Sequence, residues 1–455
     1  MFEKVLIANR GEIAVRVIRA CRELGIKTVV IHPEIDQDSL HVTLADEKVC
    51  SNDRRVYLDI NAIIEAAITT GAQAIHPGYG FLAENPNFAL ACENAGLTLI
   101  GPSSHSMRFM GEKTLARKIM LEAGVPVTPG SEVLADLEEA KIQSEKVGYP
   151  IMLKASAGGG GRGIRVVQTP EDLDKLFPEA QKEAQLAFNC PDMYIEKYLD
   201  RPRHIEIQVL ADKLGNVIYL GERECSIQRR RQKLIEEAPS LAVTNYLRSQ
   251  MGEIAVKAAK AVDYVGAGTV EFLLDQQGNF YFMEMNTRIQ VEHPVTEMVT
   301  GIDLVKEQIL IAFGEKLSVN QSEIEIKGWS IECRLIAEDT SRDFRPSPGT
   351  ITLFNPPMGP WTRLDTHVYS GFKISPFYDS LIGKLIVWGR DRKEALARLE
   401  RSLLELQVEG VKTNIYLCKQ ILSNAQFIEG DIHINLLEDL LSQKIIIGGI
   451  EDGRN

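Results

Sequence analysis

Residues 280–292 read Phe-Tyr-Phe-Met-Glu-Met-Asn-Thr-Arg-Ile-Gln-Val-Glu, an apolar start followed by alternating polar and mostly apolar residues. In an extended segment, this period of two places the polar side chains on one face. A surface strand would alternate in the same way, but this segment continues out of an apolar, core-like stretch. We therefore interpret the polar face as a functional site, formed by Glu284, Asn286, Arg288, Gln290 and Glu292.

The stretch just before this segment has the composition of a partner strand, joined to it by a Gln-Gln-Gly turn. If Asp275 faces Phe280 across that turn, Glu271 faces Glu284. Two carboxylates directly opposite each other destabilise a sheet unless something compensates their charge. With the side-chain oxygen of Asn286 they form a hard-oxygen site for Mg²⁺, and nucleotide phosphates fill the remaining positions. The prediction depends on the register, because a shift of one residue would separate the two glutamates.

A second signal is the glycine run at residues 158–161, which follows Lys154. Backbone N–H groups of glycines can approach phosphate oxygens closely. A flexible linker has a similar composition, but this run joins two strand-like segments, residues 150–156 and 163–167, so a hairpin lid is favoured. It is not a P-loop, because no GxxxxGK(S/T) pattern is present. Lys154 and the upstream Lys113 would each be solvated lysines if considered alone.

Five cations gather in one short stretch of a chain whose net charge is −12, with 63 acidic and 51 basic residues. These cations are Arg223, Arg229, Arg230, Arg231 and Lys233. Such a cluster indicates either an anion site or a nucleic-acid patch. Because it is short and has no interleaved aromatic residues, it fits a small anion better, and no nucleic-acid partner is expected.

The first hundred residues alternate strand and helix patterns. Short apolar runs predict strands at residues 4–8, 28–31, 72–75 and 97–100, and helical spacing predicts helices at 13–24, 60–68 and 88–95. This βαβ rhythm predicts a parallel sheet covered by helices. The first strand-to-helix turn, Asn9-Arg10-Gly11, is not a GxGxxG, so it does not indicate a dinucleotide site.

Hairpin patterns replace this rhythm farther along the chain. We expect paired strands at 203–210 and 216–220, and at 269–275 and 279–286, with a long helix at 245–262. Strand-like runs follow at 331–337, 349–353 and 380–387, before two or three helices. The predicted fold class is therefore α/β at the N-terminus and α+β beyond it.

The seven cysteines are scattered and form no CxxC pair, which indicates reduced thiols in a cytoplasmic protein. No apolar run approaches the roughly 18 residues of a membrane helix. No signal or transit pattern fits the N-terminus, so we expect no membrane partner.

Many stretches together, in this order, resemble biotin carboxylase, an ATP-grasp ligase, from the first residues to about residue 445. They include ANRGEIAVRVIRA, AIHPGYGFLAEN, KASAGGGGRGIRVV, EKYLDRPRHIEIQVLAD, ECSIQRRRQK, EEAPS, GAGTVEF, EMNTRIQVEHPVTEM, ECRLIAED and YDSLIGKLI. The resemblance implies a Rossmann-like N-terminal domain at residues 1–112 and an ATP-grasp domain at 113–328, with a mobile lid at about 131–203. A small α+β C-terminal domain at 329–446 and a tail at 447–455 complete the chain.

The family's site residues transfer to matching positions. The positions assigned to ATP are Lys113, Lys154, Gly160, Gly161, Glu196, Lys197, Tyr198, Leu199, His204, Arg231, Glu271 and Glu284. The metal ligands, for two Mg²⁺ or Mn²⁺ ions, are Glu271, Glu284 and Asn286. The bicarbonate pocket comprises Lys233, Arg288, Gln290, Val291 and Glu292. The residues at biotin are Arg334 and Tyr79.

The resemblance also implies the chemistry. ATP phosphorylates bicarbonate to carboxyphosphate, whose CO₂ is then placed on biotin. The catalytic residues would be Arg288, Glu292 and Lys233: Arg288 holds bicarbonate with a planar fork that lysine cannot copy, and Glu292 acts as the general base. Arg334 would stabilise the biotin enolate. Arg231 departs from the family, which often has histidine there; arginine keeps the positive charge, adds length and alters the nucleotide contacts.

Two other functions compete with this interpretation. Another ATP-grasp ligase, such as a carbamoyl-phosphate synthetase, shares the metal and glycine-loop features but not RIQVEHPVTEM with ECRLIAED. A non-catalytic nucleotide-binding subunit would be expected to lack a metal carboxylate or Arg288, and both are present. The chain has no Met-Lys-Met segment of the kind that bears biotin. We therefore expect a biotin carboxyl carrier protein or domain and a carboxyltransferase, for acetyl-CoA or pyruvate, on other chains. The family also implies a homodimer.

Overall fold

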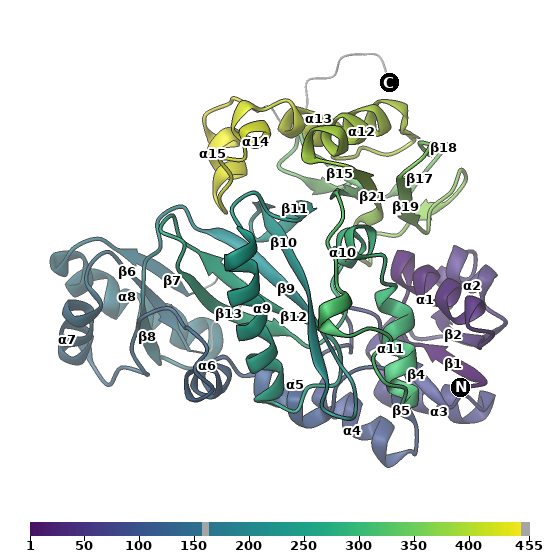
Figure 1. Cartoon of the computed structure of the whole chain (residues 1–455), viewed down its shortest axis with the longest axis horizontal. Helices are drawn as coiled ribbons and strands as arrows, with labels where there is room; N and C mark the ends of the chain where they lie inside the picture. Colours follow the sequence, from purple (N-terminus) through teal and green to yellow (C-terminus); the bar gives the residue numbers. More distant parts are fainter. Residues whose placement is uncertain (157–162, 447–455) are drawn as a thin grey trace.

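The first layer is a parallel sheet at the N-terminal end of the chain (Figure 1). A computed structural model describes residues 1–156 and 163–446. The sheet has the strand order β3-β2-β1-β4-β5. Its strands are β1 (Lys4–Ile7), β2 (Lys27–Pro33), β3 (Glu47–Ser51), β4 (Ala74–His76) and β5 (Thr98–Leu99). All neighbours are parallel, so the prediction of a parallel sheet is confirmed. The order is that of the first five strands of a Rossmann fold.

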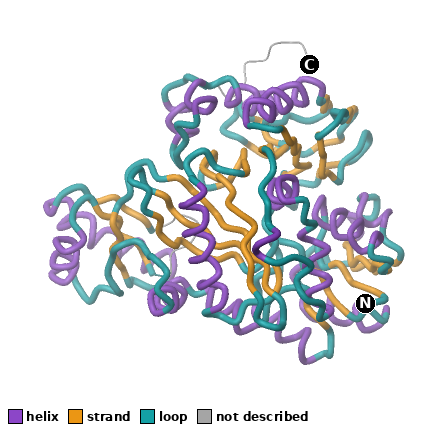
Figure 2. The backbone as a smooth tube through the Cα atoms, in the orientation of Figure 1, coloured by secondary structure: helices purple, strands orange, loops and turns teal. Residues whose placement is uncertain are grey.

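Helices cover this sheet on its faces, as Figure 2 shows by colour. They are α1 (Gly11–Glu23), α2 (Leu40–Leu44), α3 (Ile60–Thr70), α4 (Pro86–Asn94) and α5 (Ser104–Gly111). The α4 helix begins where Asn85 accepts hydrogen bonds from two backbone N–H groups of its first turn, as an N-cap does. This cap fixes the loop between β4 and α4, which borders the site described below.

An eight-stranded antiparallel sheet forms the centre of the molecule, in the order β13-β12-β9-β10-β11-β14-β21-β19. Its strands are β9 (Arg203–Ala211), β10 (Val217–Arg229), β11 (Gln232–Ala238), β12 (Gly266–Leu274), β13 (Phe280–Asn286), β14 (Trp329–Ile336), β19 (Thr362–Thr366) and β21 (Leu381–Gly389). The long helix α9 (Asn245–Lys260) packs on β9 and β10 through buried residues such as Met251 and Ala255. Because β11 pairs with β14, the sheet continues across the domain boundary predicted at residue 328.

A separate three-stranded sheet, β7-β6-β8, lies at one side of the molecule (Figure 1). It consists of β6 (Ile151–Ala155), β7 (Ile164–Val167) and β8 (Met193–Lys197), with α7 (Leu137–Val147) and α8 (Pro170–Phe188) packed on it. The antiparallel pairing of β6 with β7 agrees with the predicted hairpin. Gly160 and Gly161 lie outside the described residues, and lid closure stays a prediction.

The C-terminal part packs helices on β14 and β21. They are α12 (Arg392–Glu405), α13 (Ile415–Leu422), α14 (Ala425–Glu429) and α15 (Leu436–Ser442).

The prediction of a single strand at residues 349–353 is wrong. The segment changes partner: Ile351 donates its N–H to Phe372, whereas Thr352 donates to Glu409. It therefore forms two short strands, β17 (Gly349–Thr350) and β18 (Leu353–Asn355), in different sheets.

All seven cysteines lie in the described part of the chain and are free thiols. Of the helices within residues 1–156 and 163–446, none is both long and apolar enough to cross a bilayer.

Candidate active site

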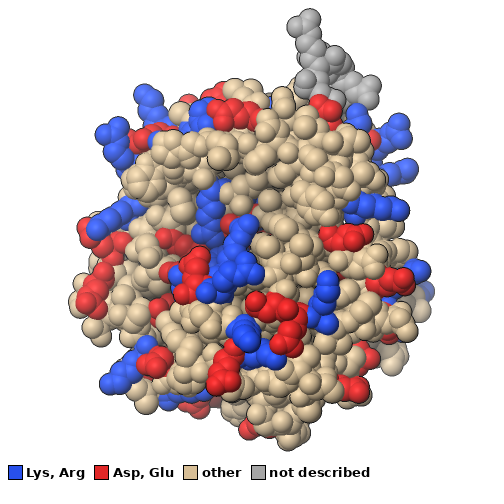
Figure 3. All heavy atoms as spheres, turned by 90° about the vertical axis from the view of Figure 1, so that its right-hand side faces the viewer, with Lys and Arg blue, Asp and Glu red and all other residues tan. Residues whose placement is uncertain are grey.

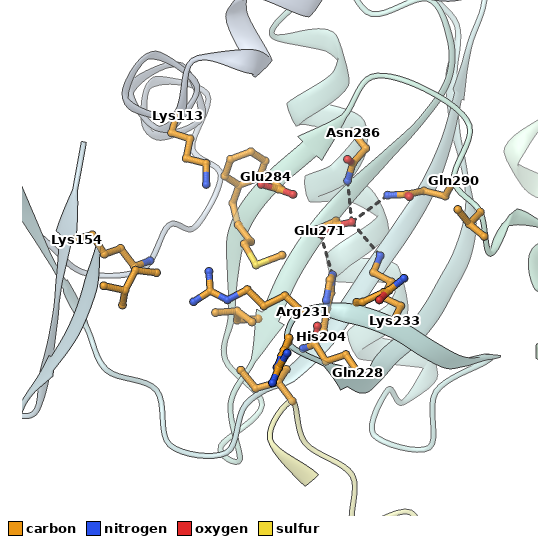
Figure 4. Close-up of a pocket in the computed structure, with 18 of the residues that line it drawn as sticks. Lys113, Lys154, His204, Gln228, Arg231, Lys233, Glu271, Glu284, Asn286 and Gln290 are labelled. Carbon is orange, nitrogen blue, oxygen red and sulfur yellow. Dashed lines mark hydrogen bonds and ion pairs between the residues drawn. The ribbon is translucent and has the colours of Figure 1, made fainter. Parts of the chain in front are cut away.

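A cavity of about 1960 Å³ opens between the N-terminal sheet, the lid and the central sheet. This volume exceeds that of a typical small-ligand site, so several ligands can bind at once. Most of the predicted site residues line this cavity. Figure 4 labels several of them, together with Gln228. The lining set includes Tyr79, Lys113, Lys154, Glu196, Lys197, Tyr198, Leu199, His204, Arg231, Lys233, Glu271, Glu284, Asn286, Arg288, Gln290, Val291 and Arg334. Glu292 is fully buried directly behind this wall.

Glu271 stands at the centre of the polar network (Figure 4). Its Oε1 accepts hydrogen bonds from Asn286 Nδ2 at 2.7 Å, from Gln290 Nε2 at 3.0 Å and from Lys233 Nζ at 3.0 Å. Its Oε2 lies 2.9 Å from His204 Nε2. Four side chains from separate segments thus converge on one carboxylate.

The predicted pairing of Glu271 with Glu284 is confirmed, although the turn was assigned wrongly. Phe280 faces Leu274 rather than Asp275. Asp275 instead accepts hydrogen bonds from residues of the turn, so it does not continue the strand. A register irregularity between Glu271 and the next residue offsets the one-residue error, and the two glutamates still lie opposite each other.

The interpretation of residues 284–292 as one extended face is wrong. The β13 strand ends at Asn286, and the next residues form an irregular segment in which Ile289 is fully buried. Glu292 then occupies the N-cap position of α10 (His293–Thr300). The predicted residues still gather at one site, but Arg288 and Gln290 reach it from a loop. Burial of Ile289 in an apolar core holds that loop in place.

The guanidinium of Arg288 is oriented by three side chains. Its NH1 donates to Gln290 Oε1 at 2.9 Å and its NH2 to Asn286 Oδ1 at 3.1 Å. On the other side, Nε donates to Glu84 Oε2 at 2.9 Å. Two N–H groups therefore point along the polar face toward acceptors that a small anion could replace.

Lys233 joins three buried glutamates. Its Nζ lies 2.6 Å from Glu206 Oε2, 3.0 Å from Glu271 Oε1 and 2.5 Å from Glu292 Oε1. The Oε2 atom of Glu292 also accepts a hydrogen bond from Arg334 NH2 at 3.0 Å. A buried carboxylate therefore connects the lysine predicted at bicarbonate with the arginine predicted at biotin.

Burial would raise the pKa of each glutamate, but neighbouring cations reverse the effect at two of them. Lys233 and His204 lower the pKa of Glu271 below its ordinary value. Lys233 and Arg334 lower the pKa of Glu292 well below its ordinary value. At Glu284 burial prevails, and together with the charge of Glu271 it raises the pKa. At neutral pH the first two are ionised acceptors.

The donor set fits a hard divalent cation. Glu271, Glu284 and Asn286 supply carboxylate and amide oxygens, the ligand types that Mg²⁺ and Mn²⁺ prefer. The Glu284 carboxylate accepts no hydrogen bond from the described residues, and burial, followed by the like charge of Glu271, raises its pKa. A cation between the two glutamates would remove that repulsion.

The lid lysine and the upstream lysine approach the cavity from different elements. Lys154, on β6, forms an ion pair with Glu196 on β8. Lys113 begins α6 (Lys113–Glu122) and points into the cavity toward Glu284 (Figure 4). Lys197 lines the cavity, and its Nζ donates to the backbone carbonyl of Gly148 at 2.7 Å.

Arg231 and Tyr79 lie at opposite parts of the cavity wall. Arg231 is exposed and has φ +67° in the tight turn between β10 and β11, next to Arg230 at φ +47°. The Arg231 side chain extends into the cavity between Lys154 and Glu284 (Figure 4), whereas Arg230 forms an ion pair with Asp343. Tyr79 donates its hydroxyl to Glu12, which in turn lies 3.1 Å from Lys384 Nζ.

Sequence reasoning missed several participants: Glu12, Glu84, Glu206, Glu236 and Lys384. Glu206 carried a usable signal, because His204, Glu206 and Gln208 alternate along β9 as the site residues of β13 do. Glu84 and Lys384 carried none, since only the tertiary fold brings them to this site.

Family models match three consecutive parts of the chain. The model for the biotin carboxylase N-terminal domain matches residues 1–107, and the one for the carbamoyl-phosphate synthase L chain ATP-binding domain matches 112–320. The biotin carboxylase C-terminal domain model matches 332–439. A biotin carboxylase of Nostoc sp. is 54% identical over 96% of this chain and 99% of its own length. The chain belongs to the biotin carboxylase family.

One further relative of this chain and one solved structure agree with this assignment. A pyruvate carboxylase subunit of Methanothermobacter thermautotrophicus is 53% identical, over 96% of this chain and 90% of its own. A crystal structure of the biotin carboxylase domain dimer of Hydrogenobacter thermophilus 2-oxoglutarate carboxylase, with MgADP, ADP and bicarbonate, is 51% identical. It superposes with a TM-score of 0.91, over 97% of this chain and 98% of its own. The family and the fold class predicted from sequence are confirmed.

Proposed function

We propose that this chain carboxylates biotin carried by a partner protein, using ATP and bicarbonate, and releases ADP and phosphate. The observation that carries the proposal is the position of Glu292. Its two carboxylate oxygens contact Lys233 at 2.5 Å and Arg334 at 3.0 Å. One buried group thus lies between the cation proposed for bicarbonate and the cation proposed for biotin, as a carboxyl transfer between the two substrates requires.

Glu292 is the proposed general base for bicarbonate. Its lowered pKa makes it a ready but weak proton acceptor in the ligand-free protein. If Lys233 turns to bicarbonate and Arg334 to the biotin ureido oxygen, Glu292 loses two of the three cations that lower its pKa, and Arg223 remains. Its basicity then rises when both substrates are bound.

Arg288 is proposed to hold bicarbonate through NH1 and NH2, which in the free protein reach Gln290 and Asn286. Lys233 would neutralise the charge that develops as a bicarbonate oxygen attacks the γ-phosphorus of ATP. The P–O bond to ADP breaks in that step and yields carboxyphosphate, whose C–O bond then breaks to give phosphate and CO₂. The phosphate would then take the ureido proton of biotin, Arg334 would stabilise the resulting enolate, and the ureido nitrogen would form the new bond to CO₂.

Glu271, Glu284 and Asn286 are the proposed ligands of two Mg²⁺ or Mn²⁺ ions. When bound, the ions would neutralise phosphate charge and align the γ-phosphoryl group. Lys113 and Lys154 would contact the phosphates, while residues 196–199 and His204 would contact the remainder of the nucleotide. Lys154 forms an ion pair with Glu196 here, so we expect it to leave Glu196 when it contacts the phosphates. We expect Arg231 to approach the nucleotide from the β10–β11 turn.

The partners follow from the chemistry. The name of the Methanothermobacter relative denotes one component of a carboxylase, which supports a biotin carrier and a carboxyltransferase on other chains. The dimer of the Hydrogenobacter domain supports a homodimer. On the face shown in Figure 3, Lys and Arg side chains gather near the centre, with Asp and Glu side chains beside them.

The alternative ATP-grasp function is not supported, because the flanking family models are those of biotin carboxylases. The decisive experiment measures phosphate release from MgATP with bicarbonate and free biotin, each omitted in turn. Release that needs both substrates, with acid-labile label from ¹⁴C-labelled bicarbonate appearing on biotin, is the expected result. Release without biotin, and no labelled biotin, would contradict the proposal.

A further inference from the structure

Glu84 lies outside the ATP-grasp part of the chain, yet it binds the segment that carries Arg288. It belongs to the loop between β4 and α4 of the N-terminal domain. Its Oε2 accepts from Arg288 Nε at 2.9 Å, and its Oε1 accepts from the backbone N–H of Thr287 at 3.1 Å. One carboxylate therefore holds the backbone at Thr287 and the side chain of Arg288.

The loop that holds Glu84 is itself anchored on both sides. Ala83 is buried and donates its N–H to Gly80, and Asn85 caps α4. Farther back, Asn9 Nδ2 donates to the carbonyl groups of Pro77 at 2.6 Å and Tyr79 at 2.7 Å. Glu84 is thus presented by a backbone that is fixed at several points before any substrate arrives.

An exposed ion pair by itself contributes little. This pair differs because the remaining N–H groups of Arg288 are directed elsewhere, to Gln290 and Asn286. Burial would lower the pKa of Arg288, but Glu84 raises it, so the guanidinium keeps its charge. If bicarbonate replaces the side-chain acceptors on NH1 and NH2, the Nε contact with Glu84 is the one side-chain contact that remains among the described residues, beside the 3.2 Å hydrogen bond from NH1 to the carbonyl of Ile289.

We propose, resting on the function proposed above, that Glu84 is a positioning residue for bicarbonate: it holds Arg288 so that NH1 and NH2 face the substrate. Because the same loop carries Tyr79 near the predicted biotin position, one N-terminal segment borders both substrates. The charge of Glu84 opposes the binding of an anion, whereas its hold on Arg288 favours it. The geometry points to the second effect as dominant, because the carboxylate contacts Nε, away from the two N–H groups that face the site.

The test compares Glu84→Ala and Glu84→Gln with Glu93→Gln, a control that removes one exposed acidic charge from the same domain. Phosphate release is measured as bicarbonate is varied, with MgATP and biotin saturating. We expect KM for bicarbonate to rise about tenfold in Glu84→Ala and less in Glu84→Gln, which keeps an acceptor for Thr287. KM for ATP and the melting temperature should stay close to those of the wild type, and Glu93→Gln should leave all three unchanged.

A second comparison uses Arg288→Lys, which has no Nε to hold. In that background Glu84→Ala should change KM for bicarbonate by less than twofold, because the coupling requires the guanidinium. An unchanged or lower KM for bicarbonate in Glu84→Ala would overturn the inference, as would an equal rise in Glu93→Gln. Absence of bicarbonate-dependent phosphate release in the wild type would instead overturn the proposed function itself.

Discussion

Glu271 and Glu284 lie directly opposite each other on β12 and β13, yet their surroundings differ. Glu271 is contacted by Lys233, His204 and two amides, whereas Glu284 accepts no hydrogen bond within the described residues. Burial together with the charge of Glu271 raises the pKa of Glu284. The pair is therefore incomplete without a cation, and this asymmetry underlies the first prediction.

Glu284→Gln should weaken binding of the metal ion that the reaction requires. Loss of one carboxylate ligand is expected to raise the Mg²⁺ concentration for half-maximal phosphate release by about tenfold or more. In metal-free protein the same change removes a like-charge repulsion, so its melting temperature should equal or exceed that of the wild type. Glu315→Gln, which removes an exposed acidic charge, serves as the control. A Mg²⁺ dependence identical to that of the wild type would refute the role of Glu284.

Lys233→Met should destabilise the protein most at high pH. It leaves Glu206, Glu271 and Glu292 buried without their shared cation. We expect the melting temperature at pH 8 to fall by roughly 5 °C or more. Without Lys233, Glu271 and Glu292 have higher pKa values in the folded variant than in the folded wild type. The variant therefore loses stability as pH rises, and its difference in melting temperature from the wild type shrinks toward pH 5.5. Lys260→Met, at an exposed position, is the control; an equal deficit at both pH values would be inconsistent with this explanation.

Glu236 should make stability depend on pH near neutrality. Its pKa is raised from 4.5 to about 7, chiefly by burial. The positive charge of Arg334 lowers this pKa, and the negative charge of Glu292 raises it. Burial also raises the pKa of Glu332, which faces Glu236 across the strands. Between pH 4.5 and 7 the folded protein binds more protons than the unfolded chain, so stability falls as pH rises through that window.

Glu236→Gln should flatten this dependence when the melting temperature is followed from pH 5 to pH 9. The glutamine can still accept the hydrogen bond from Arg334 Nε, which measures 2.6 Å. Glu253→Gln changes an exposed charge and should follow the wild-type curve. If Glu236→Gln also followed that curve, the raised pKa would be wrong.

Glu292→Gln should abolish most of the turnover while leaving the fold intact. Removing the proposed general base and the charge between Lys233 and Arg334 is expected to lower kcat by about 10²–10⁴. ADP binding, measured by calorimetry, should change little, because no predicted nucleotide contact involves Glu292. Turnover within threefold of the wild type would exclude Glu292 as the base.

Sequence alone could place the residues that depend on short-range pairing. Glu271 and Glu284 are joined by one hairpin, so their pairing survived a wrong assignment of the turn. The edge strand β3 was not predicted, because its half-exposed residues lack an apolar run. Residues 287–292 were misread as extended, since a buried Ile289 at an odd position fits both a strand and a loop anchored in the core.

The long-range relationships could not be predicted in the same way. Lys233 and Arg334 meet at Glu292 only because β11 pairs with β14, strands that are about a hundred residues apart in the chain. Glu84 reaches Arg288 from another domain. The family resemblance supplied roles for the first two residues but gave no reason for their proximity.

The central claim is that the buried glutamates and the cations around them bring bicarbonate to the γ-phosphate of ATP. The most direct test supplies ¹⁸O-labelled bicarbonate with MgATP and biotin and measures the mass of the phosphate released. If bicarbonate is phosphorylated, each phosphate carries one oxygen from bicarbonate, and Arg288→Ala loses both label and turnover. Phosphate released at the normal rate without ¹⁸O would mean that water attacks ATP, and would contradict the account.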